Sequence, residues 1–183
     1  MKQIKQFRVT SLADLEMVSD WLSVRLKQGD CLGLAGPLGA GKTTLTQSLA
    51  ARLGIREAVD SPTFTLRQSY PATHLTIKQL VHYDFYRLLS TAALAELGLA
   101  DDWAQPQSLL VIEWVDKFPE LLDQLSYLVT ITLNKTFGNF PSLQECPSHS
   151  SGSSLLECSQ FAKVLLDSKN DERIITIQTG KDQ

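Results

Sequence analysis

Gly36-Pro37-Leu38-Gly39-Ala40-Gly41-Lys42-Thr43 is the stretch that decides the fold of this chain, because it has the G-x-x-x-x-G-K-T pattern of a phosphate-binding P-loop. The apolar run 31–35 precedes it and suits a buried parallel strand. The segment after it carries three leucines at helical spacing, Leu45, Leu49 and Leu53. Strand, glycine loop and helix in this order are the context that the motif requires. We therefore expect an α/β protein with a three-layer P-loop NTPase fold and a mixed, mainly parallel central sheet.

The residue types of this loop match the chemistry of phosphate binding. Glycines let successive backbone N–H groups turn toward an anion, and the following helix adds the positive end of its dipole. Lys42 can reach the β- and γ-phosphates and assist catalysis, and the Thr43 hydroxyl can ligate Mg²⁺. The expected phosphate-binding residues are Leu38, Gly39, Ala40, Gly41, Lys42, Thr43 and Thr44.

Length and composition favour one soluble domain over residues 1–183. The net charge is −3 and no run of Lys and Arg stands out, so a groove that binds nucleic acid unaided is not expected. The three cysteines lack C-x-x-C spacing, which argues against a disulfide framework or a zinc site. The sequence shows neither an apolar signal core nor a membrane span, so we expect a cytoplasmic protein with no membrane partner.

The segment before the P-loop predicts a short strand at 5–9 and then a helix. Thr10 or Ser11 can cap this helix, with Asp14 placed as in a capping box if Ser11 is the cap, and Gly29 is expected to end it. Because adenine often packs on residues near such an entry, Thr10 to Leu12 is a candidate for the adenine site.

The segment after the P-loop helix predicts a second group of elements. Residues 64–70 and 80–88 read as an antiparallel hairpin with a long loop, beside a parallel core. The other expected elements are a short helix at 92–97, a buried strand at 109–114 and strands at 128–133 and 173–178. The last two are expected to be neighbours joined by an insertion at 134–171, which is rich in Ser, Gly, Pro, Asn and Gln and reads as loop with some helix.

Two acidic residues are candidates for the metal side of the site. Glu113 ends an apolar strand, where a Walker B carboxylate would hold Mg²⁺ directly or through water. Asp84 could orient the attacking water or help hold Mg²⁺, although a solvent-facing strand residue would fit the pattern equally well. Ser61 and Thr63 could sense the γ-phosphate, or could simply form a Ser-Pro turn.

The segment Asn134-Lys135-Thr136-Phe137 bears on the choice of nucleotide. GTPases read guanine with Asn-Lys-x-Asp, and here the acidic residue is replaced by Phe137. The guanine contact is therefore missing, and we expect the nucleotide to be ATP.

Four motifs together resemble TsaE, the P-loop ATPase family of bacterial tRNA threonylcarbamoyladenosine synthesis. They are Leu38-Gly39-Ala40-Gly41-Lys42-Thr43-Thr44, Ser61-Pro62-Thr63-Phe64-Thr65-Leu66, His82-x-Asp84-x-Tyr86-Arg87-Leu88 and Glu113-Trp114. The P-loop is shared by a large superfamily, whereas the other three are specific in combination. The resemblance covers about residues 10–133 and the strand near Arg173.

The resemblance implies a subunit that binds and hydrolyses ATP with Mg²⁺. It would act with the TsaB–TsaD pair, which modifies the adenosine next to the tRNA anticodon, so that tRNA is contacted through partners. Site roles follow by motif: Thr43 and Glu113 hold Mg²⁺, and Asp84 is needed for hydrolysis. The remaining residues placed at the nucleotide or its surroundings are Ser61, Thr63, Trp114 and Arg173.

One departure from the family lies in the P-loop itself. The family usually has Asp where this chain has Pro37, and proline removes an N–H and a carboxylate from that position. We expect phosphate binding to survive, because that N–H is not a central donor. Two alternatives stay open at this point: a P-loop kinase of a small metabolite, and a non-hydrolysing binding module that depends on ATP.

Overall fold

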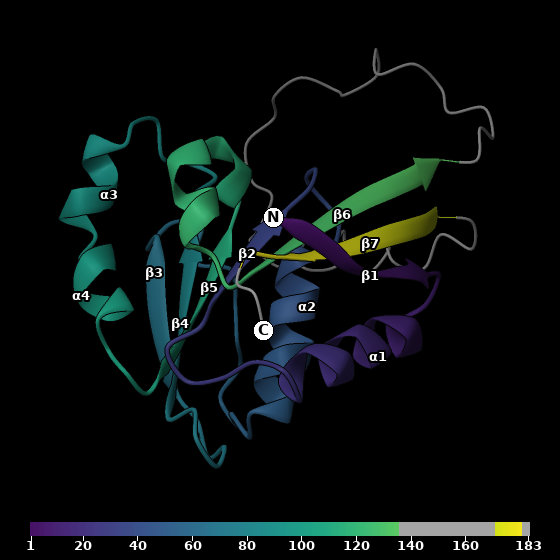
Figure 1. Cartoon of the computed structure of the whole chain (residues 1–183), viewed down its shortest axis with the longest axis horizontal. Coiled ribbons are helices and arrows are strands. Elements are labelled where there is room, and N and C mark those ends of the chain that lie inside the picture. Colours follow the sequence, from purple (N-terminus) through teal and green to yellow (C-terminus); the bar gives the residue numbers. More distant parts are fainter. Residues whose placement is uncertain (136–170, 181–183) are drawn as a thin grey trace, which may run out of the picture.

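The computed structural model describes residues 1–135 and 171–180, and these form one seven-stranded sheet in the order β1-β7-β6-β2-β5-β4-β3. The strands are β1 (Lys2–Val9), β2 (Cys31–Ala35), β3 (Arg67–Pro71), β4 (Gln79–Asp84), β5 (Ser108–Glu113), β6 (Tyr127–Lys135) and β7 (Asp171–Thr179). The helices are α1 (Leu12–Ser23), α2 (Lys42–Arg52), α3 (Ala92–Glu96), α4 (Leu99–Trp103), η1 (Val115–Lys117) and η2 (Pro119–Gln124). Figure 1 shows their arrangement.

The centre of the sheet is parallel and its two edges are antiparallel. β6, β2, β5 and β4 pair in parallel, whereas β1, β7 and β3 join through antiparallel ladders. β2 and β5 are buried along their whole length, as expected for strands covered on both faces. The mixed α/β fold with a parallel centre agrees with the expectation from the P-loop context.

Helices cover the two faces of the sheet and create two apolar cores. On one face α1 and α2 pack together, and the core there includes Leu22, Leu45 and Leu49. On the other face α3, α4, η1 and η2 contribute to a second core that includes Phe85 and Phe118. Figure 1 shows α1 and α2 close together and α3 and α4 beside β3 and β4. The three layers match the predicted architecture.

The N-terminal helix confirms the predicted start and corrects the predicted end. Ser11 and Asp14 form a complete capping box, with the Ser11 hydroxyl accepting the Asp14 N–H at 3.2 Å. The helix ends at Ser23, not near Gly29. Gly29 instead adopts φ +78° in the turn before β2, where its N–H donates to the Ser108 carbonyl at 2.7 Å.

The predicted hairpin exists, but both of its strands are shorter than expected. β3 begins at Arg67 because Leu66 has φ +63°, which a continuous strand does not allow. β4 ends at Asp84, whose Oδ1 accepts the Tyr86 N–H at 2.9 Å and starts a turn. The first strand was predicted to stop at residue 70, but Pro71 is the last residue of β3, which tolerates a proline because it is an edge strand.

β6 and β7 are antiparallel neighbours, as predicted, and they extend further than expected. Asn134 and Lys135 belong to β6 and Asp171 begins β7, so three residues assigned to the insertion lie in the ladder. The Asn134 amide also donates to Glu172 at 3.1 Å across the two strands. The rest of the predicted insertion, 136–170, lies outside the described residues.

Candidate nucleotide site

The P-loop connects β2 to α2, at the carboxyl ends of the parallel strands. Gly36, Gly39 and Gly41 all have positive φ, which bends the loop backbone between the strand and the helix. The close approach of β6 explains Gly36 in particular, since a Cβ there would lie 2.5 Å from the Ile131 carbonyl oxygen. Ala40 is buried, whereas Leu38 is 74% exposed. The loop therefore has the backbone shape that the motif predicted.

Lys42 begins α2, and its ammonium group is held by loop carbonyls and by an aromatic ring. Its Nζ donates to the carbonyls of Gly36 and Pro37 at 2.8 and 2.9 Å. The same atom lies 3.6 Å from the centre of the Trp114 ring, a cation–π contact. Burial lowers the pKa of Lys42, and the nearby charges of Glu113, Asp116 and Asp84 oppose that shift.

Thr43 and Glu113 meet across the site. The Thr43 hydroxyl donates to Glu113 Oε2 at 3.1 Å, which brings the two predicted metal ligands together. Glu113 is 2% exposed at the end of β5, and its Oε1 lies 2.8 Å from Nε2 of His82. Thr44 follows Thr43 in the first turn of α2. The Glu113 carboxylate is therefore buried and in contact with the P-loop helix.

Asp84 lies beside Glu113 and is contacted by the Ser-Pro-Thr loop. Because β4 and β5 are parallel, Asp84 and Glu113 are register partners at the ends of their strands. Asp84 is 2% exposed, and its Oδ2 accepts the hydroxyls of Ser61 at 2.7 Å and Thr63 at 2.6 Å. The structure therefore excludes the solvent-facing alternative for Asp84, and it links the two hydroxyl residues to the acidic side of the site.

Arg173 reaches the P-loop from β7, far away in the sequence. Its Nε donates to the Ala40 carbonyl at 3.1 Å, and the residue is 5% exposed. A narrow hollow beside this contact is lined by Thr10, Ser11, Leu12, Leu15, Gly41 and Arg173 among others. The segment predicted to meet adenine therefore lies next to the phosphate loop.

Two residues near the site had no role in the sequence prediction. His82 contacts Glu113, and it could have been found from its i, i+2 spacing to Asp84, which places both on one face of a strand. Lys117 donates to three carbonyls, those of Phe85, Tyr86 and Leu88, at 2.6–3.1 Å. No sequence pattern indicated these hydrogen bonds of Lys117, because they depend on how η1 packs against the segment after β4.

The donor set fits a magnesium ion that is held mainly by a nucleotide. Within residues 1–135 and 171–180 no group of three or more His, Cys, Asp or Glu side chains could hold a metal by itself. Mg²⁺ is commonly bound through one or two carboxylates together with substrate phosphates and water. The hydroxyl of Thr43 and the carboxylate of Glu113, already in contact, match that pattern.

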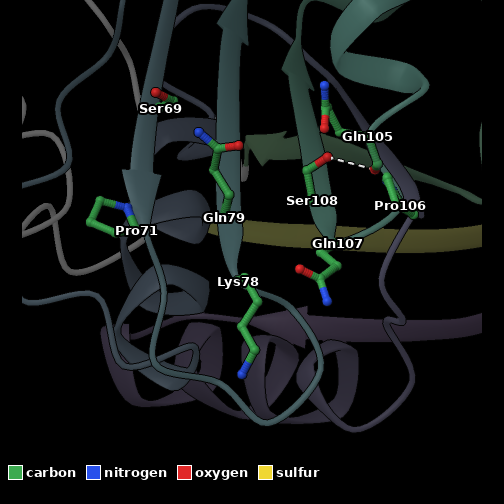
Figure 2. Close-up of a pocket in the computed structure, with 8 residues that line it drawn as sticks. All are labelled: Ser69, Pro71, Lys78, Gln79, Gln105, Pro106, Gln107 and Ser108. Carbon is green, nitrogen blue, oxygen red and sulfur yellow. Dashed lines mark hydrogen bonds between the residues drawn. The ribbon is translucent and has the colours of Figure 1, made fainter.

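A larger hollow lies at the opposite ends of the strands. It has a volume of about 420 Å³ and is lined by Ser69, Pro71, Lys78, Gln79, Gln105, Pro106, Gln107 and Ser108. Figure 2 shows these side chains around the starts of β4 and β5. Because the P-loop and the acidic pair lie at the carboxyl ends of the parallel strands, this hollow is separate from the candidate nucleotide site.

Comparison with known proteins decides the family. The family described as threonylcarbamoyl adenosine biosynthesis protein TsaE matches residues 9–139. The chain belongs to the TsaE family. It is 36% identical over 124 residues to the tRNA threonylcarbamoyladenosine biosynthesis protein TsaE of Bacillus subtilis, covering 68% of this chain and 74% of that protein. It is 44% identical over 94 residues to the Streptomyces coelicolor TsaE, covering 51% and 62%.

A solved structure supports the fold of this TsaE family member. The crystal structure of Bacillus subtilis YdiB superposes with a TM-score of 0.59 at 25% identity, over 98% of this chain and 87% of that chain. Family membership makes the chain a P-loop protein of the ATP-binding type within a group named for tRNA threonylcarbamoyladenosine biosynthesis. It does not favour the small-metabolite kinase. In the described part of the chain no helix is long and apolar enough to cross a membrane.

Proposed function

We propose that this protein binds and hydrolyses MgATP in the cytoplasm as a subunit needed for threonylcarbamoyladenosine modification of tRNA. The observation that carries the proposal is the contact between Thr43 and Glu113 at the mouth of a P-loop. It joins the P-loop hydroxyl that would ligate Mg²⁺ to a carboxylate at the end of a strand, which is the arrangement of a P-loop NTPase. Membership of the TsaE family supplies the pathway.

Each part of the site has a role in this proposal. Loop amides from Leu38 to Thr44 and the Lys42 ammonium bind the phosphates, while Thr43 and Glu113 hold Mg²⁺. Lys42 must leave two carbonyls and the Trp114 ring to reach a phosphate. Bound Mg²⁺ would neutralise charge that develops on the phosphates.

Asp84 is the residue that we assign to hydrolysis. Its carboxylate is buried next to Glu113 and carries the hydroxyls of Ser61 and Thr63, so it can orient a water near the γ-phosphate. When the γ-phosphate is present, the two hydroxyls would exchange their hydrogen bonds to Asp84 for hydrogen bonds to that phosphate, so the loop would respond to it.

The base of the nucleotide is assigned to the N-terminal side of the loop. Thr10 to Leu12 and Arg173 lie around the hollow beside Gly41, the side of the P-loop away from Asp84 and Glu113. Adenine is favoured over guanine because the segment at 134–137 lacks the acidic residue of the guanine-reading motif.

The proposed partner is the TsaB–TsaD pair, with tRNA contacted through it. The net charge of −3 and the lack of a run of basic residues fit a subunit that leaves nucleic acid to its partners. A pull-down with purified TsaB and TsaD, with and without ATP, tests this part. Failure to bind in both conditions would contradict the partner assignment.

An ATPase assay with matched variants tests the chemistry. We expect slow release of free phosphate by the purified protein and no release by Lys42→Ala. Undiminished activity in that variant would refute the P-loop assignment. Phosphate that appears on an added metabolite would indicate the kinase, and ATP-dependent partner capture without any phosphate release would indicate a binding module.

A further inference from the structure

His82 is a buried polar residue for which the proposed chemistry has no use so far. It lies in β4, is 0% exposed, and its Nε2 is 2.8 Å from Oε1 of Glu113. Its other ring nitrogen, Nδ1, is buried and has no hydrogen-bond partner among the described residues. The contact with Glu113 is thus the polar interaction that this ring makes in that part of the chain.

An imidazole in this position is costly unless it serves a purpose. A buried polar group left without a hydrogen bond costs about 1–3 kcal/mol, and such groups in native proteins call for an explanation. An apolar side chain of similar size would avoid that cost at Nδ1 of His82. What it could not do is donate a hydrogen bond to Glu113, since an ionised carboxylate only accepts.

The geometry places His82 behind the metal-facing carboxylate. Thr43 donates to Oε2 of Glu113 from the P-loop side, and His82 contacts Oε1 from the neighbouring strand. β4 and β5 run parallel with Asp84 opposite Glu113, and His82 lies two residues before Asp84 on the same face of β4. Both oxygens of the Glu113 carboxylate are therefore in hydrogen-bond contact with side chains from different elements.

We propose that His82 is a positioning residue for Glu113: it holds Oε1 so that Oε2 points at Thr43 and at the Mg²⁺ of the bound nucleotide. This inference rests on the proposed MgATP site. Without the imidazole, the Glu113 carboxylate could rotate, and one of its oxygens would be left buried without a hydrogen-bond partner. Removing an outer-shell partner of this kind typically lowers metal affinity or activity by about 10–100-fold.

The test measures the metal dependence of nucleotide binding in the full-length protein. Affinity for the non-hydrolysable analogue AMPPNP is measured by calorimetry in Mg²⁺ and again in EDTA, and the ratio of the two reports how well the site holds the metal. His82→Gln and His82→Asn form the matched pair. Both are amides, but the glutamine nitrogen reaches near the position of Nε2, whereas the asparagine nitrogen is one methylene short.

We expect the Mg²⁺-to-EDTA affinity ratio to fall about 10–100-fold in His82→Asn and to recover most of its value in His82→Gln. Affinity in EDTA should stay near that of the wild type in both, because the phosphate loop is untouched. An unchanged ratio in His82→Asn, or equal losses in both variants, would overturn the proposal. A wild-type protein that binds no AMPPNP in either condition would instead refute the proposed function itself.

Thermal melting separates positioning from packing. If His82 were needed only for packing, the affinity ratio would be insensitive to which amide is present, and only the melting temperature would change. We expect the opposite: the two variants should differ in metal dependence even where their melting temperatures agree. A ratio that follows melting temperature and not donor reach would overturn the positioning role.

Discussion

Replacing Asp84 by Asn separates its charge from its shape. The carboxylate accepts three hydrogen bonds, from the Ser61 and Thr63 hydroxyls at 2.7 and 2.6 Å and from the Tyr86 N–H at 2.9 Å. Asparagine keeps one oxygen for the Tyr86 N–H, and its amide group can donate to a hydroxyl that turns around to accept. The loop between Ser61 and Thr63 should therefore stay in place.

The expected losses in stability and in activity differ greatly. Hydrogen bonds to an ionised group are worth about 1.5–3 kcal/mol against about 0.5–1.5 for neutral pairs. In Asp84→Asn three hydrogen bonds are weakened, but the variant no longer buries a charge at this 2% exposed position. We expect the net result to be a loss of about 1–3 kcal/mol in the free energy of unfolding. Hydrolysis should fall by about 10²–10⁴-fold, the usual contribution of a positioned acid or base.

Three assays on the same preparation check these figures. Chemical denaturation measures the free energy of unfolding, and phosphate release in saturating MgATP measures the rate, with AMPPNP calorimetry showing that nucleotide still binds. Asp84→Ala serves as the control that removes both shape and charge. A rate in Asp84→Asn within a few-fold of the wild type, with stability reduced as expected, would show that the charge of Asp84 serves folding and not hydrolysis.

Three further perturbations follow from the packing. Asp102→Asn should cost about 1–3 kcal/mol at pH 7, since Arg67 donates twice to that carboxylate at 2.6 and 2.7 Å. Arg67 lowers the pKa of Asp102 in the folded state. The stability that this ion pair contributes is therefore fully present above the unfolded pKa of about 3.9 and is lost as pH falls through the folded pKa. Urea unfolding curves of the variant and the wild type should thus converge in acid. Gly33→Ala should destabilise by about 1–3 kcal/mol in thermal melts, because its Cβ would lie 2.5 Å from the Leu125 side chain. Because the Lys42 ammonium contacts the Trp114 ring at 3.6 Å and is expected to leave it for a phosphate, nucleotide binding should change tryptophan fluorescence, and Trp114→Phe should abolish that change. A change that persists in the variant would place the reporter at another tryptophan.

Local sequence patterns were sufficient to predict several elements of the fold. The P-loop motif with its flanking strand and helix predicted β2, the loop and α2, and the Ser11 capping box predicted the start of α1. Hydrophobic runs gave the approximate positions of β5, β6 and β7, and the glutamate that ends β5. These features are local because turn chemistry, capping and periodicity act between residues a few positions apart.

Element ends were predicted less well where hydrogen bonds within short turns set them. A strand was expected to continue through Leu66, but the turn closed by its N–H on the Pro62 carbonyl at 2.6 Å gives it positive φ. The strand through Asp84 was also expected to be longer, and the bond from its carboxylate to the Tyr86 N–H ends it. The hydrophobic periodicity does not reveal these hydrogen bonds, because the apolar pattern continues on both sides of each turn.

The arrangement of the acidic side of the site depends on strand pairing, which the sequence pattern does not reveal. Parallel pairing of β4 and β5 sets Asp84 opposite Glu113, and that same register brings His82 to the far oxygen of the glutamate. The pattern of the sequence left Asp84 equally suited to solvent, whereas the structure buries it under two hydroxyls. Strand order and register join residues about 30 positions apart, and these pairings depend on the packing of the whole sheet. The sequence motifs therefore predicted the candidate site residues, and the fold showed how Asp84, Glu113 and His82 are arranged against one another.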